Sequence, residues 1–123
     1  DNIFLKAEIY TKLKKYENAV ADYKILIEKN DENYIEKAYY GIIETLYILE
    51  NYKEVIRYGE MYIRKNYSKY KYEVIEKKAF AYLKDNEYEK SIWDFQTLQT
   101  LQSKSDMATY MIAQVYYNQK KYK

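Results

Sequence analysis

Hydrophobic positions along this chain recur with the spacing of amphipathic helices rather than with the alternation of strands. Ile3, Ala7 and Tyr10 follow the spacing i, i+4, i+7, which puts their side chains on one face of a helix. The same spacing returns in later segments. The pattern predicts helices near residues 3–14, 16–29, 34–49, 52–65, 71–84, 88–102 and 106–119.

A sequence repeat underlies these helices. The stretch KKYENAV at the start of the second predicted helix returns loosely as ENYKEVI and NEYEKSI, and its tyrosines, Tyr16, Tyr52, Tyr88 and Tyr122, are 36, 36 and 34 residues apart. A fixed period in this range indicates stacked repeat units. Further positions keep the same register: Ala7, Ile43, Ala79 and Ala113; Tyr10, Leu46, Tyr82 and Tyr116; Ala19, Val55 and Ser91; Val20, Ile56 and Ile92.

Each repeat is expected to be a hairpin of two antiparallel helices, with the recurring tyrosine opening the second helix. The turns before that tyrosine are too short for any other arrangement of neighbouring helices. The chain has no proline and two glycines, so the turn chemistry of an all-β protein is missing. We therefore predict one all-α domain over residues 1–123, with units near 3–32, 33–68, 69–103 and a partial unit at 104–123.

The repeated pattern resembles the tetratricopeptide repeat family: a small residue, an aromatic residue three positions later, and a tyrosine that opens the second helix. The resemblance implies a right-handed solenoid of three hairpins plus the first helix of a fourth. Two features depart from the family. Asp31, Tyr67 and Ser103 stand where it has proline, and the period is 36 rather than the usual 34. The longer period is similar to that of bacterial envelope proteins, which favours an envelope or periplasmic location over the cytoplasm.

The second unit differs from its neighbours at three interior positions. Gly59 replaces an aromatic residue, Tyr62 replaces a leucine, and Ile43 replaces an alanine. One interpretation is an exchange that conserves volume, which cores tolerate better than a void. The alternative is a deliberate gap at Gly59.

The amino-acid composition excludes most kinds of catalytic site. The chain has no histidine and no cysteine, so Ser–His or Cys–His nucleophiles and ordinary zinc sites are excluded. Gly41 and Gly59 stand alone inside helical segments, and a phosphate-binding loop needs a glycine cluster. We expect a protein that is not an enzyme and that uses no cofactor and no metal.

Charge does not single out a partner class. The formal net charge is +2, and both signs are interspersed along the chain, so no strong field for nucleic acid or anionic lipid is expected. Long uncharged runs are missing, so no membrane span is predicted. The chain begins at Asp1 rather than at a methionine, and we expect a longer natural protein.

The resemblance to tetratricopeptide repeats implies that the first helix of each unit lines a concave groove. The groove would bind a peptide segment or a partner protein, and its aromatic and acidic side chains favour a segment with apolar anchors and some basic residues. Gly41 would let the backbone of the ligand approach closely. The alternative is that some rings pack between units and that a chain with 19 tyrosines has tyrosine everywhere. The expected groove residues are Phe4, Glu8, Tyr40, Gly41, Glu44, Tyr47, Glu76, Lys77, Phe80, Tyr110, Gln114 and Tyr117.

Two other functions stay open. A structural spacer or self-association module would use the edge of the fourth unit, where Ala113 and Tyr116 would be bare unless the chain continues or meets another copy. The other is binding of nucleic acid. The segment Lys65–Tyr72 interleaves lysines and tyrosines, a combination that can bind single-stranded nucleic acid by stacking and phosphate contact. The mixed charge elsewhere makes nucleic acid the least favoured partner.

Overall fold

The computed structural model describes residues 2–121, and this part of the chain is all-helical, with seven helices and no strand. All seven helices predicted from the hydrophobic pattern are confirmed, and their ends differ from the predicted ones by three residues at most. The recurring tyrosines Tyr16, Tyr52 and Tyr88 are the first residues of α2, α4 and α6. The helices are α1 (Asn2–Lys12), α2 (Tyr16–Lys29), α3 (Ile35–Ile48), α4 (Tyr52–Arg64), α5 (Lys71–Lys84), α6 (Tyr88–Gln99) and α7 (Ser105–Lys121).

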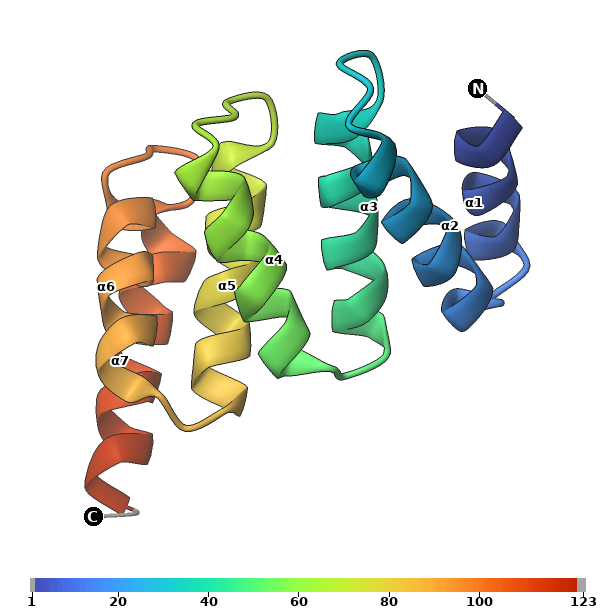
Figure 1. Cartoon of the computed structure of the whole chain (residues 1–123). Helices are drawn as coiled ribbons and strands as arrows, with labels where there is room; N and C mark the ends of the chain where they lie inside the picture. The colour runs from blue at the N-terminus through green and yellow to red at the C-terminus, as the bar shows by residue number, and fades with distance from the viewer. Residues whose placement is uncertain (1, 122–123) are drawn as a thin grey trace.

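Helices that follow one another in the sequence pack against one another. In addition, α3 and α5, which are separated in the sequence by α4, are in direct contact. Figure 1 shows the resulting row of helices, with α1 and the N-terminus at one end and α7 and the C-terminus at the other. Most contacts are therefore local in sequence, which favours fast folding and allows one end to loosen without the other.

The three hairpin turns share one backbone geometry. Lys14, Glu50 and Asn86, which are spaced by the repeat period, adopt left-handed conformations with φ of 61°, 60° and 61°. The residue after each one donates its N–H to a carbonyl five residues back, at 2.8–3.0 Å. This is the Schellman arrangement, which ends a helix and satisfies its last carbonyls. The turns thus close without the glycine that usually occupies this position.

We expect Glu50→Gly to stabilise the fold. A left-handed conformation costs an L-residue about 1–2 kcal/mol, and glycine avoids this cost. Part of the resulting gain is offset because glycine has a greater conformational entropy in the unfolded state. The expected net gain is about 0.5–1 kcal/mol in the free energy of unfolding, measured by urea denaturation. The control, Asn86→Gly, should gain less because asparagine tolerates this conformation. A lower midpoint for Glu50→Gly than for wild type would contradict the argument.

Small residues fill the crossing points inside the hairpins. Ala7, Ala79 and Ser91 are fully buried, and the Ser91 hydroxyl donates to the Ala79 carbonyl at 2.8 Å, tying α6 to α5. In the second unit, Ile43 and Tyr62 are also fully buried.

The space beside Gly59 is filled rather than empty. A Cβ built there would lie 2.4 Å from Cγ of Lys78 and 2.7 Å from Cδ. The lysine stem therefore occupies the volume that a larger residue would need. This contact excludes the gap at Gly59 and supports the interpretation that volume is exchanged between neighbouring side chains.

The buried apolar side chains form two clusters that meet in α5. The larger cluster runs from α1 to α5 and includes Val74 and Ala81, whereas the smaller one joins α5, α6 and α7 and includes Ile75 and Ala79. Consecutive residues of α5 thus face opposite neighbours. This helix is the seam between the two halves of the core.

Candidate binding site

Five of the expected groove residues line one hollow between α1 and α3. This hollow has a volume of about 380 Å³ and lies at the end of the row that contains the N-terminus. Its walls come from the first helices of two neighbouring hairpins and from the turn that precedes α5. Its lining residues are Phe4, Glu8, Tyr23, Lys37, Tyr40, Gly41, Glu44, Lys69 and Tyr70.

The aromatic rings of the hollow are held by other rings. Tyr40 stacks on Tyr70, with centroids 4.4 Å apart and planes 6° apart. The centroid of the Phe4 ring lies 5.6 Å from that of Tyr34 and 6.3 Å from that of Tyr23, which it meets edge to face. Because Phe4 and Tyr40 are half-buried in these contacts, each offers only part of its ring to a ligand. They form a preorganised apolar wall, which lowers the entropic cost of binding.

The hollow carries charges of both signs. Glu8, which is exposed, and Glu44, which is half-buried, line it from equivalent positions of α1 and α3. Lys37 and Lys69 also line it and are exposed. The Lys37 ammonium lies 5.9 Å from the centre of the Phe4 ring, and the Lys69 ammonium lies 5.4 Å from the centre of the Tyr70 ring. The groove pattern alone suggested an acidic surface, but the hollow also contains lysines.

The hydroxyls of Tyr23 and Tyr40 remain protonated at neutral pH. Burial raises the pKa of Tyr40, and the adjacent Glu44 carboxylate raises it further. Burial also raises the pKa of Tyr23, with smaller contributions from Glu8 and Glu44 in the same direction and an opposing hydrogen bond with Thr11. These phenols can donate hydrogen bonds, but they are not activated as nucleophiles.

Gly41 does not leave room for a ligand, which corrects the expectation of a close backbone approach there. A Cβ built on Gly41 would lie 2.4 Å from Cζ and 2.9 Å from the hydroxyl of Tyr23. The Tyr23 ring, which comes from α2 and is buried, already fills this space. Glycine is needed here so that the ring can pass over α3.

The remaining expected residues of α3 and α5 make contacts within the protein. The Lys77 ammonium lies 4.9 Å from the centre of the Tyr47 ring, and Tyr47 meets Tyr52 edge to face. Phe80 packs edge to face on Phe95, with centroids 5.1 Å apart. Glu76 forms a 2.6 Å ion pair with Lys104 from the loop before α7.

The three expected residues of α7 lie at the opposite end of the row from the hollow (Figure 1). Tyr110 and Tyr117 are 63% and 64% exposed, and Gln114 is half-buried. The structure therefore does not bring the twelve residues together in a single pocket.

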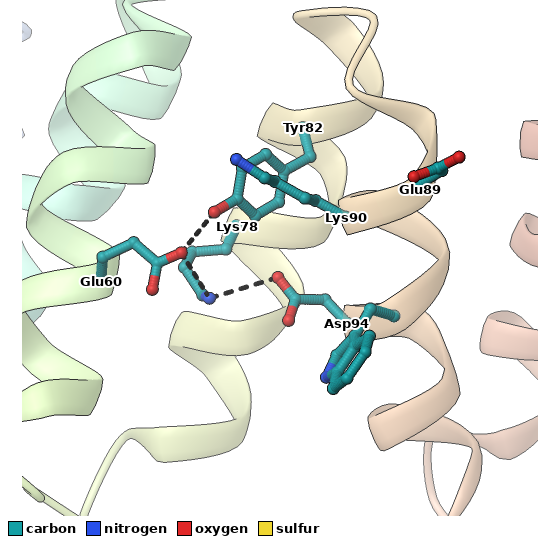
Figure 2. A pocket seen from close by; sticks show the side chains of 7 residues that line it. Glu60, Lys78, Tyr82, Glu89, Lys90 and Asp94 are labelled. Atoms are coloured by element: carbon teal, nitrogen blue, oxygen red, sulfur yellow. Dashed lines mark hydrogen bonds and ion pairs between the residues drawn. The ribbon is translucent and has the colours of Figure 1, made fainter.

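A second hollow, of about 370 Å³, opens between α4 and α6 above α5. Figure 2 shows the Lys78 ammonium between the carboxylates of Glu60 and Asp94, at 3.6 Å and 3.3 Å. Lys78 and Asp94 are 5% and 8% exposed. The Tyr82 hydroxyl also donates to Glu60. Asp94 Oδ2 is buried, and its partner is the Lys78 ammonium at 3.3 Å.

The sequence carried an overlooked signal for this pair. Lys78 and Asp94 occupy the same repeat positions as Lys6 and Asp22, which form a 3.7 Å ion pair in the first hairpin. In the second hairpin the corresponding residues are Ile42 and the aromatic Tyr58. A polar pair that recurs in register in two of three hairpins indicates contact between its members.

Two tyrosines of the segment Lys65–Tyr72, Tyr67 and Tyr70, pack on the protein, whereas the other residues of the segment are exposed. Tyr67 contacts Tyr39 and Tyr62, and Tyr70 is covered on one side by Tyr40. The Tyr62 hydroxyl accepts a hydrogen bond from the backbone N–H of Tyr70 at 2.8 Å. This arrangement is that of a turn between hairpins with two of its three rings engaged, which leaves little ring surface for stacking with bases.

Comparisons with known proteins assign no family. No protein-family model matches the sequence, and no significant match is found among curated proteins.

Within residues 2–121, no helix is long and apolar enough to cross a membrane. In the same range, no group of three acidic side chains is arranged to hold a metal ion.

Proposed function

We propose that this chain is a non-catalytic scaffold of tetratricopeptide-like hairpins, stacked as a right-handed solenoid, that binds a peptide segment of another protein. The repeated turn geometry, the recurring buried positions and the packing of consecutive helices support this architecture. In such a stack the first helices line the inner face, which is where solenoids generally bind their partners. The resemblance that suggested this architecture also supports a bacterial envelope location.

The hollow between α1 and α3 is the observation that carries the proposal. It combines a half-buried aromatic wall with two carboxylates from equivalent positions of neighbouring helices. An apolar side chain would lie against Phe4 and Tyr40, and an adjacent lysine or arginine would pair with Glu8 and Glu44. The Lys37 and Lys69 side chains at the rim would accept an acidic residue or a carboxylate further along the segment.

The test is selection of a random 12-residue peptide library on the immobilised chain. We expect recovered peptides to combine an aromatic or aliphatic residue with a nearby lysine or arginine. The double variant Glu8→Gln and Glu44→Gln should bind the recovered peptides at least about tenfold more weakly in fluorescence anisotropy, since two charge-assisted contacts are lost.

Glu17→Gln is the matched control, because Glu17 is an exposed carboxylate on α2 outside the hollow. Its affinity should equal that of wild type, and all variants should keep their far-ultraviolet circular dichroism. Recovered peptides that bind the double variant as tightly as wild type would contradict the proposal. Failure to recover any peptide would favour a structural spacer.

A further inference from the structure

The hollow between α4 and α6 contains a large aromatic side chain that the core does not use. Trp93, the only tryptophan of the chain, lines this hollow and is 73% exposed. Tryptophan is among the residues that interfaces most often use as anchors. The hollow has a volume of about 370 Å³, within the range of about 300–1,000 Å³ that ligand sites have. There is thus room for a ligand group beside the indole ring.

The exposure of Trp93 follows from its place in the repeat. The same position is exposed in the two earlier hairpins, where it is Ala21 and Arg57, although another hairpin follows each of them. The three helices around the hollow, α4, α5 and α6, also pack against a neighbour on both sides. The hollow therefore belongs to the interior of the row, and it does not depend on the helices at either end.

Two carboxylates of the hollow can accept further hydrogen bonds. Lys78 and Tyr82 both approach Glu60 at Oε1 (Figure 2). Because the Glu60 side chain is 41% exposed, its second oxygen remains open to a ligand. Glu89 is exposed and forms no ion pair within residues 2–121. Glu60 comes from α4 and Glu89 from α6, so the two carboxylates belong to different walls of the hollow.

The ammonium groups of the hollow are already paired. Lys78 lies between Glu60 and Asp94, and the Lys90 ammonium lies 3.3 Å from the Glu87 carboxylate. Since a further carboxylate lines the hollow, its carboxylates outnumber its ammonium groups. A cationic ligand is therefore favoured over an anionic one, which would meet an excess of like charge.

The second hairpin holds a guanidinium in such surroundings within the protein itself. Arg57 occupies the repeat position of Trp93. Its Cζ atom lies 4.4 Å from the centre of the Tyr58 ring, and its Nε and Nη2 atoms donate to Glu54 at 2.6 Å and 3.0 Å. The guanidinium thus stacks on a ring and pairs with a carboxylate at the same time. The third hairpin has a ring and carboxylates at this surface but no arginine of its own.

We propose that the hollow between α4 and α6 binds an arginine side chain of a partner protein, with the guanidinium stacked on Trp93. Glu89 lies four residues before Trp93 on α6, so the two side chains are neighbours on the helix surface and Glu89 pairs with the stacked guanidinium. Glu60 adds a second carboxylate from the other wall. Arginine suits this combination better than lysine, because its planar group stacks on a ring while its N–H groups reach a carboxylate. The site shares no residue with the hollow between α1 and α3.

Titration of the isotope-labelled chain with acetyl-arginine N-methylamide tests the site by nuclear magnetic resonance, because the indole N–H of Trp93 is the only one in the chain. We expect this resonance and the amides of α6 to shift with a dissociation constant of about 1–10 mM, as suits one anchored side chain. The citrulline analogue, which has the same shape without the charge, should bind at least about tenfold more weakly. Equal binding of the two probes, or shifts confined to α1 and α3, would overturn the proposal.

Charge variants test the sign of the ligand. Glu89→Gln should weaken binding of the arginine probe at least about threefold, and Lys90→Gln should tighten it about twofold because a like charge is removed. Glu17→Gln is the matched control, since Glu17 has the repeat position of Glu89 but lies on α2, outside the hollow. Its affinity should equal that of wild type. Weaker binding in Lys90→Gln would indicate an anion site, and it would overturn the proposal, as would an unchanged affinity in Glu89→Gln.

A variant that fills the hollow with its own arginine gives an independent measurement. The double variant Lys90→Glu and Trp93→Arg rebuilds in the third hairpin the Arg57–Glu54 pair of the second. Both substituted positions are exposed, so the variant should keep its circular dichroism and melting temperature. The amides of α6 should no longer shift when the probe is added, because the new guanidinium occupies the site. Shifts equal to those of wild type would contradict the role of Trp93.

Discussion

Lys78→Met is expected to lower the free energy of unfolding by about 3–5 kcal/mol, because removal of one partner leaves the other charge buried without compensation. Lys78 holds its ammonium between Glu60 and Asp94 in the hollow shown in Figure 2, and Asp94 is 8% exposed. Methionine keeps most of the stem that fills the space beside Gly59. The loss should therefore report on charge rather than on packing, and it can be measured by urea denaturation at neutral pH.

The first hairpin supplies a matched control. Lys6 and Asp22 form the equivalent pair. Asp22 is 6% exposed, as buried as Asp94, but the Lys6 side chain is 57% exposed and the two charged atoms are 3.7 Å apart. Lys6→Met should cost less than Lys78→Met, because the hydrated Lys6 ammonium interacts only weakly with Asp22, whose Oδ2 already lacks a hydrogen-bond partner. Equal costs for Lys6→Met and Lys78→Met would contradict the role of the buried Lys78 ammonium.

The second hairpin supplies the rescue. Ile42 and Tyr58 occupy the positions of Lys78 and Asp94, and both are buried. The double variant Lys78→Ile and Asp94→Tyr should recover most of the stability lost in Lys78→Met, because a buried ion pair can be replaced by packed apolar residues at little cost.

The deficit of Lys78→Met should also depend on pH. Burial raises the pKa of Asp94, and the Lys78 charge opposes this shift. Without Lys78 the pKa of Asp94 in the folded state should rise further. A carboxyl whose pKa is raised on folding stabilises the fold only where it is protonated, and this contribution is lost as the pH rises through the folded pKa. The deficit should therefore shrink as the pH is lowered, and a deficit independent of pH would count against a buried carboxylate.

Phe95→Ala is expected to cost about 3–5 kcal/mol and to loosen only one end of the molecule. Phe95 is fully buried and contacts Phe80 within the smaller core cluster of α5, α6 and α7. Because helices pack mainly on their neighbours, the cavity should open α6 and α7 before the rest. Hydrogen exchange should show faster exchange there, with α2 and α3 still protected.

Leu26→Ala is the matched control for this prediction. Leu26 is fully buried in α2, in the larger cluster, so this change should accelerate exchange at the N-terminal end instead. A single cooperative opening of all seven helices in both variants would show that the two clusters are not separable. It would also mean that a disturbance of the C-terminal helices reaches the hollow between α1 and α3.

Features that repeat could be predicted from the sequence, and features that depend on one side chain could not. The repeat period predicted the helices, the hairpin turns and the buried small residues, because equivalent positions pack in the same way in each hairpin. The filling of Gly41 by Tyr23 joins different hairpins through a long side chain. The Lys104–Glu76 pair likewise depends on the path of a loop. Periodicity does not encode such contacts.

The candidate site divides in the same way. Phe4, Glu8, Tyr40 and Glu44 were found because they share repeat positions on α1 and α3. Lys37, Lys69 and Tyr70 were missed because they belong to helix ends and turns, where a contact depends on how one hairpin sits on the next. The expectation that charge and aromatic rings would gather along one groove therefore overstated how many of them are available to a ligand.

The turn geometry at Lys14, Glu50 and Asn86 has a consequence for how the surface can vary. The chain reverses there through backbone hydrogen bonds, and all three side chains point to solvent. One residue is cationic, one is anionic and one is neutral, yet all three have nearly the same φ. Substitutions at these three positions can thus change the charge of this surface while the hairpins keep their shape.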